Sequence, residues 1–277
     1  MRLLQPRTCC LTLVDDIVAE RQNGIHAAFF KGIAGEWRVR VKDYIDHGGS
    51  PEHVASWPDI DARKSTFHNL YASAGRGSAH GDVIEALRDH ELDLCPACGE
   101  PGVPNTLDHY LPKGKYPHFA IVPVNLVPMC DACQAKKLEK TGDADHPRFF
   151  IHPYFDVFSI PRIVDLVITP PFETPTFVLR PHPDLQPAEW TLVDVHLREL
   201  DIPTRYVSFF RSEYRRLIRN VSKLRTTGQA VQPSLEGFRE GAAYPTRNSW
   251  QHVFYSAVLE NPNFIEFLDE GELPPFP

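Results

Sequence analysis

Residues 95–137 read CPACGEPGVPNTLDHYLPKGKYPHFAIVPVNLVPMCDACQAKK. Two Cys-x-x-Cys pairs lie near the ends of this stretch, Cys95 with Cys98 and Cys130 with Cys133. Each pair can present two thiolates from a tight turn, and two such pairs together complete a tetrahedral four-cysteine zinc site. Because four protein ligands leave zinc no open position, we expect a structural ion that staples the segment between the pairs.

The segment between the pairs contains short apolar runs separated by loops. The runs TLDHYL and FAIVPVNLV suit short β-strands, whereas DACQAKKLEK carries strong helix formers and no proline. The order strand, loop, strand, helix therefore predicts a ββα unit. Adjacent residues of a strand point to opposite faces, so Asp108 and His109 can serve one site only where the strand twists or ends.

The residues between the cysteine pairs resemble the HNH endonuclease family, which has the ββα-metal fold. The pattern comprises Asp108-His109, Pro112-Lys113, Asn125-Leu126-Val127-Pro128 and the second cysteine pair with Lys137 after it. More narrowly, LDHYLPK, a following YP, NLVPMCDACxxKK and a later HPYFD are similar to HNH proteins of bacterial and phage-defence systems. The resemblance covers roughly residues 95–156.

The resemblance implies a role for each matching residue. His109 would be the general base that activates water, and a neutral histidine suits that role near pH 7. Asp108 would be a ligand of the catalytic Mg²⁺ or Mn²⁺, which prefers hard oxygen ligands. Asn125 would hold the loop that orients His109. The family's second metal ligand is a His or Asn just after the last cysteine, and Gln134 stands there instead, with one more methylene.

The basic residues have more than one interpretation each. Lys113 in the loop and Lys137 on the following helix would contact a substrate phosphate, or would be solvated surface lysines. The Arg-rich segment 205–225 is a candidate duplex-binding face, a solvated face or an interface with an acidic partner protein. We expect His118 in a surface loop, although it is close enough in sequence to reach the site.

The flanks predict an α+β protein with three regions. Residues 1–90 read as helical, residues 91–156 as the HNH module, and residues 157–277 as a mixed region that ends in helices. In the last region RIVDLVITP, TFVLRP and EWTLVDVH read as strands, and the chain returns to helix from Leu200.

Composition limits the kind of protein and the kind of partner. The formal net charge of -7 excludes a uniformly positive surface for nucleic acid, so any DNA-binding site must be local. No long apolar run and no signal-peptide core occurs, which predicts a soluble cytoplasmic protein without a membrane partner. The net charge and the resemblance together suggest a partner that delivers substrate, an ATPase or another defence-system protein.

Two functions from different classes follow from these residues. The first is a metal-dependent HNH endonuclease that hydrolyses DNA in an antiviral defence system, with RNA or single strands left open as substrates. The alternative is a zinc-ribbon-like module, a catalytically degenerate HNH protein that binds nucleic acid or protein. An adaptor has no need of Asp108, His109 and Asn125 between its cysteines, whereas Gln134 favours the degenerate reading.

Overall fold

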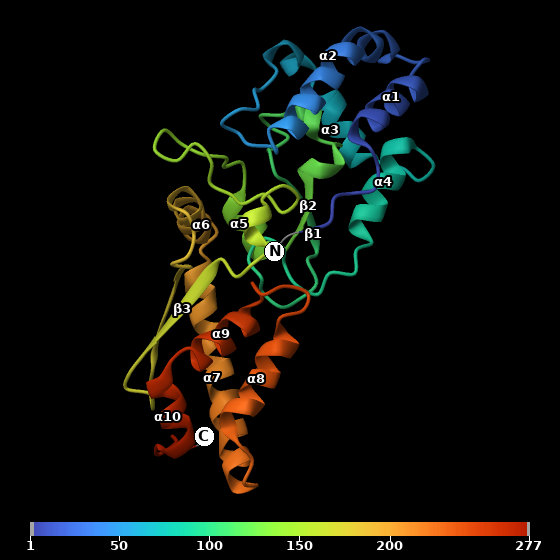
Figure 1. Ribbon diagram of the computed structural model, residues 1–277. Coiled ribbons are helices and arrows are strands. Elements are labelled where there is room, and N and C mark those ends of the chain that lie inside the picture. The colour runs from blue at the N-terminus through green and yellow to red at the C-terminus, as the bar shows by residue number, and fades with distance from the viewer. Residues whose placement is uncertain (1–2, 276–277) are drawn as a thin grey trace. The chain divides into compact units, whose positions relative to one another are not determined.

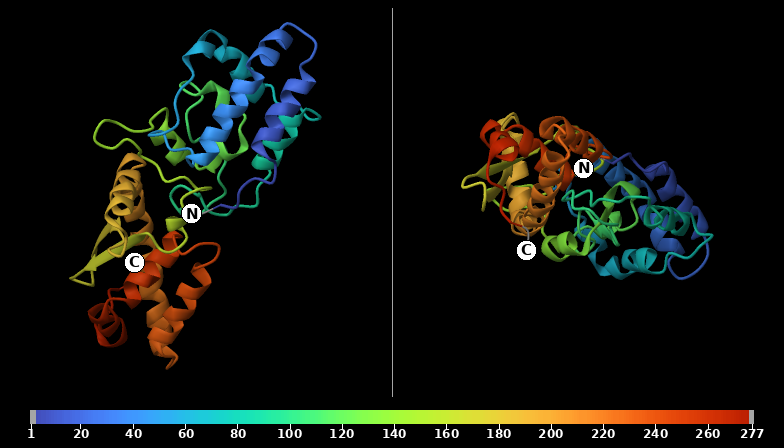
Figure 2. Two further views of the ribbon diagram at one scale, coloured as in Figure 1. Left: turned by 45° about the horizontal axis from the view of Figure 1, so that its top comes forward. Right: turned by 90° about the horizontal axis from the view of Figure 1, so that it is seen from below.

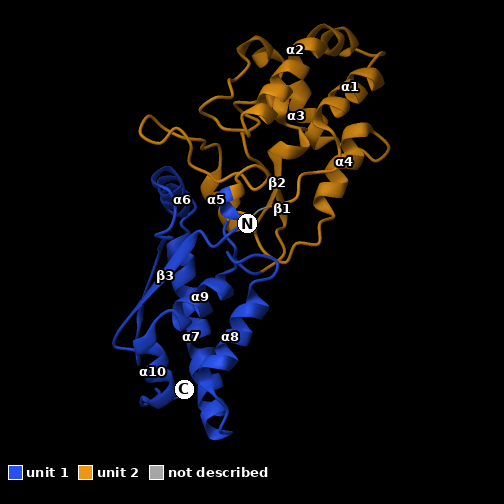
Figure 3. Ribbon diagram, viewed as in Figure 1, with its two compact units in different colours: residues 1, 98–101, 158–277 blue, residues 2–97, 102–157 orange. Residues whose placement is uncertain are grey.

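The computed structural model describes residues 3–275 and divides them into two compact units (Figures 1 and 3). The N-terminal unit comprises residues up to 97 and 102–157, and the C-terminal unit comprises residues 98–101 and 158 onward. The described residues form ten α-helices and two antiparallel two-stranded sheets, which confirms the predicted α+β class. No helix within residues 3–275 has the length and hydropathy needed to cross a bilayer.

The N-terminal unit surrounds one short hairpin with helices. The strands β1 and β2 pair in antiparallel register from Thr106↔Met129 to His109↔Leu126. Helix α4 packs against α1 and against both strands, and α1 packs along α2 (Figure 2). The elements follow the predicted order and are α1 (Cys10–Glu20), α2 (Ala27–Asp46), α3 (Lys64–Ala72), α4 (Ala79–Arg88), β1 (Thr106–His109), β2 (Leu126–Met129) and α5 (Asp131–Lys137).

Aromatic packing fixes the helices of this unit to the loop between its two strands. The ring of Trp37 on α2 is fully buried, with its centroid 5.9 Å from that of Phe30 and 5.2 Å from that of Phe67. Its Nε1–H donates a hydrogen bond of 2.8 Å to the carbonyl of His118. A buried indole N–H needs such a partner, so this contact joins the aromatic core to the β1–β2 loop.

The C-terminal unit combines a second hairpin with a helical layer. Strands β3 and β4 pair from Val164↔Pro181 to Thr169↔Thr176. Helix α7 packs against β4 and α6, while α8 lies along α9 (Figure 1). The elements are β3 (Val164–Thr169), β4 (Thr176–Pro181), α6 (Pro187–Glu199), α7 (Ile202–Thr226), α8 (Val231–Ala242), α9 (Trp250–Leu259) and α10 (Pro262–Glu270).

The strand predicted for EWTLVDVH was wrong, because these residues form most of α6. A capping box starts the helix: the side chains of Gln186 and Glu189 each bond the other residue's backbone, and Pro187 occupies the first turn. The buried residues Val193 and Leu197 stand four positions apart and face the interior together. Local start signals and this helical spacing outweigh the strand preference of the valines.

The basic residues predicted on α7 separate into internal and exposed ones. Arg205 pairs with Glu100, and Arg225 donates to the carbonyls of Phe267, Leu268 and Gly271, so both arginines have structural partners. Four exposed members recur at four-residue intervals on the opposite side from the buried stripe that contains Phe210. They are Arg211, Arg215, Arg219 and Lys223, and we name them the α7 basic stripe. Arg216 is also exposed and pairs with Glu213 on the same helix.

Candidate functional site

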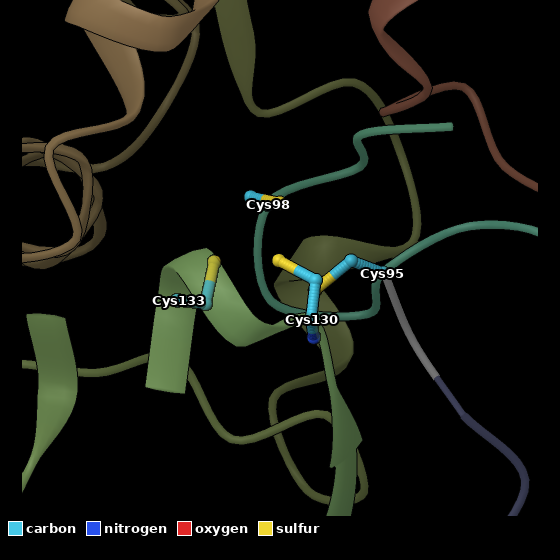
Figure 4. Close-up of side chains that lie close together, drawn as sticks. All are labelled: Cys95, Cys98, Cys130 and Cys133. Carbon is cyan, nitrogen blue, oxygen red and sulfur yellow. The ribbon is translucent and has the colours of Figure 1, made fainter. Parts of the chain in front are cut away.

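The four cysteines of the two Cys-x-x-Cys pairs lie together (Figure 4). Their sulfur atoms are all within 4.8 Å of one another. Tetrahedral zinc with Zn–S bonds of about 2.3 Å requires sulfurs about 3.8 Å apart, so the four thiols fit such an ion after a small inward movement. The cluster could therefore hold a metal such as zinc, and it consists of Cys95, Cys98, Cys130 and Cys133.

Local structure explains how the cysteines converge. Cys130 is the N-cap of α5, which places Cys133 in the first turn of the helix. The backbone N–H of Cys130 points at the sulfur of Cys95 at 3.4 Å, an interaction that favours a thiolate. Gly99 follows the first pair with a φ of 75°, and a Cβ there would lie 2.1 Å from the carbonyl oxygen of Asn248. Only glycine fits that turn.

The two residues expected to carry the chemistry lie at the end of β1. Asp108 pairs with Val127 and His109 with Leu126, and the strand stops at His109. The N–H of Tyr110 still bonds the carbonyl of Asn125 at 2.8 Å, so the chain leaves the sheet immediately afterwards. Because the strand ends there, the adjacent side chains of Asp108 and His109 can serve one site.

His109 is held as a neutral imidazole. Its Nε2 lies 2.9 Å from the carbonyl oxygen of Ala120, which can only accept, so Nε2 carries the proton and Nδ1 has the free lone pair. Nδ1 makes no hydrogen bond with the described residues. Burial, and to a smaller extent the positive charges of Lys113 and Lys137, lower the pKa of His109 to about 3. At neutral pH the ring is therefore uncharged and able to accept a proton.

Asp108 is paired with a buried lysine. The Nζ atom of Lys137 lies 2.9 Å from Oδ2 of Asp108 and donates at 2.7 Å to the carbonyl of His109. The Lys137 side chain is only 1% exposed, so this lysine is internal and not a solvated surface residue. The carboxylate keeps Oδ1 without a polar partner among residues 3–275. One carboxylate oxygen with water for the remaining ligands fits Mg²⁺, which retains several waters in protein sites.

Asn125 fixes the loop that carries His109. Its side chain is fully buried, and its Nδ2 donates at 3.1 Å to the carbonyls of both Leu111 and Phe119. Its Oδ1 accepts from the N–H of Leu111 at 2.7 Å and from the hydroxyl of Tyr44 at 3.1 Å. Four hydrogen bonds thus satisfy both ends of the amide and hold the two sides of the β1–β2 loop together.

A polar chain continues from Asn125 to the HPYFD segment. The Nδ1 of His152 accepts from the N–H of Tyr154 at 3.2 Å, so its Nε2–H donates to the Tyr44 hydroxyl at 2.9 Å. Tyr44 in turn donates to Asn125. His152 is fully buried and supports the loop from a position well outside the hairpin in sequence.

Gln134 and Lys113, the other two predicted site residues, are less constrained. Gln134 is half-buried on α5, and its side chain has no polar partner among the described residues. Lys113 follows β1 in the loop, with its Nζ 4.8 Å from the ring centroid of Tyr71. Both side chains can therefore change their contacts when a ligand binds.

Residues of α3 and α4 also surround His109, and no sequence motif pointed to them. The ring of Tyr71 meets that of His109 edge-on at 4.5 Å, and its hydroxyl donates at 2.9 Å to the carbonyl of Leu107. His68 bonds the carbonyl of Lys113 at 2.9 Å, and Arg88 lies 5.5 Å from the Tyr71 ring. The only signal was the three-residue spacing of His68 and Tyr71 on one helix face.

The surface position expected for His118 was wrong. Its side chain is fully buried, with the ring centroid 5.5 Å from that of Trp57 and 3.9 Å from that of Phe119. Burial lowers its pKa to about 3. His118 belongs to the core beneath the loop, where an apolar environment favours the neutral ring.

Comparison with known proteins finds a distant relative in a phage. The chain is similar to "Protein ea31" of Escherichia phage lambda, with 27% identity over 196 residues. The match covers 62% of this chain and 64% of the phage protein, so the chain spans less than two thirds of that relative. No family model and no solved structure matches the chain. The name of the relative states no activity.

Proposed function

We propose that this chain is a metal-dependent nuclease that hydrolyses phosphodiester bonds in DNA. The observation that supports it most is His109, a buried neutral imidazole with an unpartnered Nδ1 beside a carboxylate at the end of a hairpin strand. Phosphodiester hydrolysis needs a base for water, compensation of developing negative charge, and rigid positioning. The resemblance to HNH enzymes and the ββα order of elements agree with this proposal.

His109 would take the proton of the attacking water. The water oxygen forms the new bond to phosphorus, its proton passes to Nδ1, and the P–O bond to the leaving strand breaks. The Ala120 carbonyl keeps Nε2–H fixed, so the same nitrogen always faces the water. A phosphate anion beside the ring would raise the low pKa of His109 and strengthen it as a base.

Charge compensation would come from Asp108 and nearby cations. A Mg²⁺ or Mn²⁺ ion held by Asp108, directly or through water by Gln134, would stabilise the negative charge of the transition state. Lys113 would bind a substrate phosphate from the loop. Lys137 holds Asp108 in place from inside, and its own contact with substrate phosphate stays a prediction.

The four cysteines would hold a structural zinc ion. Four thiolates fill a tetrahedral shell, so such an ion has no site for water or substrate. Cys133 belongs to the helix that carries Gln134 and Lys137, and the ion would fix the start of that helix relative to β2.

A binding module is the second candidate, and the Lys137–Asp108 pair favours it. The ammonium compensates part of the charge that a divalent cation would otherwise neutralise, and Gln134 replaces the family's usual ligand. In that case the cysteine cluster would maintain a surface that docks nucleic acid or protein without chemistry. DNA as substrate, a cytoplasmic location and a defence-system ATPase as partner are part of the first proposal.

Plasmid cleavage with Mg²⁺, Mn²⁺ or EDTA tests the proposal. His109→Ala should abolish cutting while retaining zinc, and His53→Ala, an exposed histidine of the same unit, should cut like wild type. Cutting that survives in zinc-replete His109→Ala would reject His109 as the base. If zinc-replete wild type does not cut, an autonomous nuclease is rejected and the binding module is favoured. Pull-down from native extract then identifies any required partner.

A further inference from the structure

A polar cavity lies in the C-terminal unit, and none of its lining residues belongs to the proposed nuclease site. Its volume is about 410 Å³, within the range of sites that hold small ligands. Helix α8, the loop after it and helix α9 form most of its wall, and one arginine comes from the segment before β3. The charged and titratable residues of this arginine pocket are Arg162, Arg239, Arg247, Glu240, Glu260 and His252.

Asn248 builds the pocket by tying two distant segments together. Its Nδ2 donates to the carbonyls of Ser159 at 3.0 Å and Pro161 at 2.8 Å. Its Oδ1 accepts from the N–H of Ile163 at 2.8 Å. These bonds flank Arg162 on both sides, so a buried amide fixes the backbone from which that arginine enters the pocket.

The positive charge of the pocket exceeds what its own carboxylates compensate. Arg162 pairs with Glu260 through Nη2 at 2.7 Å, whereas its Nη1 is buried and bonded to nothing in the described chain. Arg239 and Arg247 form no ion pair with residues 3–275, and neither does Glu240. A buried guanidinium nitrogen without an acceptor is costly, and an incoming anion would supply that acceptor.

His252 provides a neutral acceptor on the wall of the pocket. Its Nδ1 donates to the carbonyl of Arg239 at 3.1 Å, which leaves Nε2 with the lone pair. Burial lowers the pKa of His252, and the nearby charges of Arg162, Arg239 and Arg247 lower it further. The ring can accept a hydrogen bond from a singly protonated phosphate.

We propose that the arginine pocket binds a phosphate group, carried either by a small phosphate ester or by a nucleic-acid strand. Planar guanidinium groups match phosphate oxygens through paired, charge-assisted hydrogen bonds. Three guanidinium groups reach this cavity from three segments, so they can surround a tetrahedral anion. The proposal does not depend on the nuclease proposal, because the two sites share no residue.

Calorimetric titration of the full chain in buffer without divalent cations tests the pocket. Inorganic phosphate is the first probe, and a short single DNA strand without terminal phosphate is the second. Arg239→Ala combined with Arg247→Ala should weaken phosphate binding at least about tenfold, because two charge-assisted hydrogen bonds are lost. Glu240→Gln should strengthen binding about threefold, because it removes a negative charge from the pocket.

Matched variants and competition complete the test. Lys31→Ala with Arg63→Ala removes the same charge from exposed positions of the N-terminal unit and should leave phosphate binding unchanged. Displacement of phosphate by the strand assigns the pocket to nucleic acid, and failure to displace bound phosphate assigns it to small phosphate esters. The proposal is overturned if neither probe binds, or if the Arg239 and Arg247 substitutions change binding no more than the Lys31 and Arg63 substitutions do.

Discussion

Lys137 is the residue on which the two functional interpretations divide. A buried ammonium lies 2.9 Å from Oδ2 of Asp108 and holds that carboxylate in position. In a nuclease, the ion pair would leave Oδ1 of Asp108 available to a catalytic cation. In a binding module, the ammonium of Lys137 would take the place of that cation. Both interpretations require the ion pair to be a strong internal interaction, and its strength can be measured.

We expect Lys137→Met to destabilise the N-terminal unit by about 3 kcal/mol, because it leaves the carboxylate of Asp108 buried without a partner. Denaturant unfolding of zinc-replete protein measures the change. In the double variant with Asp108→Asn, most of the loss should be recovered, since no unpaired charge remains. A loss below about 0.5 kcal/mol in the single variant would mean that the pair is no stronger than a surface ion pair.

Tyr44→Phe should cost about 1–2 kcal/mol, because it leaves Nε2–H of His152 without an acceptor and removes one donor from Asn125. The matched control is Tyr116→Phe, a buried tyrosine of the same unit whose hydroxyl has no hydrogen bond to residues 3–275, and it should change stability little. Equal effects of the two substitutions in thermal unfolding would contradict a supporting role for the Tyr44 hydroxyl.

Helix α5 is the element that joins the cysteine cluster to the candidate site. It spans Asp131–Lys137, so it is too short to be stable alone, and its position depends on what fixes its ends. Cys133 is in its first turn and Lys137 in its last. Loss of a metal ion at one end should therefore disturb the Asp108 pair at the other.

Metal analysis of purified protein should find one zinc per chain. Cys133→Ser should lose the ion and at least about 3 kcal/mol of unfolding free energy, because metal binding is coupled to folding. Cys9→Ser, which alters an exposed cysteine outside the cluster, should retain the zinc ion and the wild-type free energy of unfolding. A stable Cys133→Ser variant without zinc would show that the thiols pack without an ion.

The α7 basic stripe gives a test of duplex binding at the scale of one helix. Arg211→Ala with Arg215→Ala should reduce the slope of log affinity against log salt by about 2, since each lost phosphate contact removes nearly one released counterion. Fluorescence anisotropy with a duplex at several salt concentrations measures the slope. Lys31→Ala with Arg63→Ala, exposed residues of the other unit, is the control. An unchanged slope would identify the stripe as a solvated face.

Sequence patterns predicted the elements whose signals are local. The ββα order and α7 follow from short strand runs and a helical stripe. The predicted position of the second strand was wrong for most of FAIVPVNLV, because the prolines of this run favour short turns and β2 begins only at Leu126. Helix α8 was not predicted, because Pro233, Gly237 and Gly241 interrupt its pattern, and packing against α9 supplies what propensity lacks.

The candidate site could be predicted only in part, because some of its residues come together only through tertiary packing. Asp108, His109 and Asn125 come from one motif, whereas Tyr44, Tyr71 and His152 approach from distant positions that only tertiary packing brings together. The arginine pocket has no sequence motif at all.

Over the whole chain, buried neutral histidines link stability to acidity. Burial lowers the pKa of both His109 and His118 from 6.5 to about 3. As pH falls below 6.5 the unfolded chain binds these protons and the folded chain does not, until pH nears 3. The stabilisation is therefore complete above pH 6.5 and is lost as pH falls from 6.5 towards 3, by up to about 1.4 kcal/mol per pH unit for each histidine.

Urea unfolding of the N-terminal unit between pH 7 and pH 4 measures this dependence. His118→Phe should make the dependence shallower by about one proton, because phenylalanine takes no proton in either state. His53→Ala, which changes an exposed histidine, should keep the wild-type dependence. Parallel curves for wild type and His118→Phe would show that His118 titrates normally in the folded protein.

The polar chain from His152 through Tyr44 to Asn125 has a consequence for synthesis on the ribosome. Every predicted site residue has left the exit tunnel before His152 does, yet the loop around His109 has its full set of hydrogen bonds only once His152 is present. A nascent chain paused shortly after Lys137 would hold both cysteine pairs with an incompletely supported loop. If the chain is a nuclease, this order of assembly delays a competent site until the 15 residues from Leu138 to His152 have followed the motif.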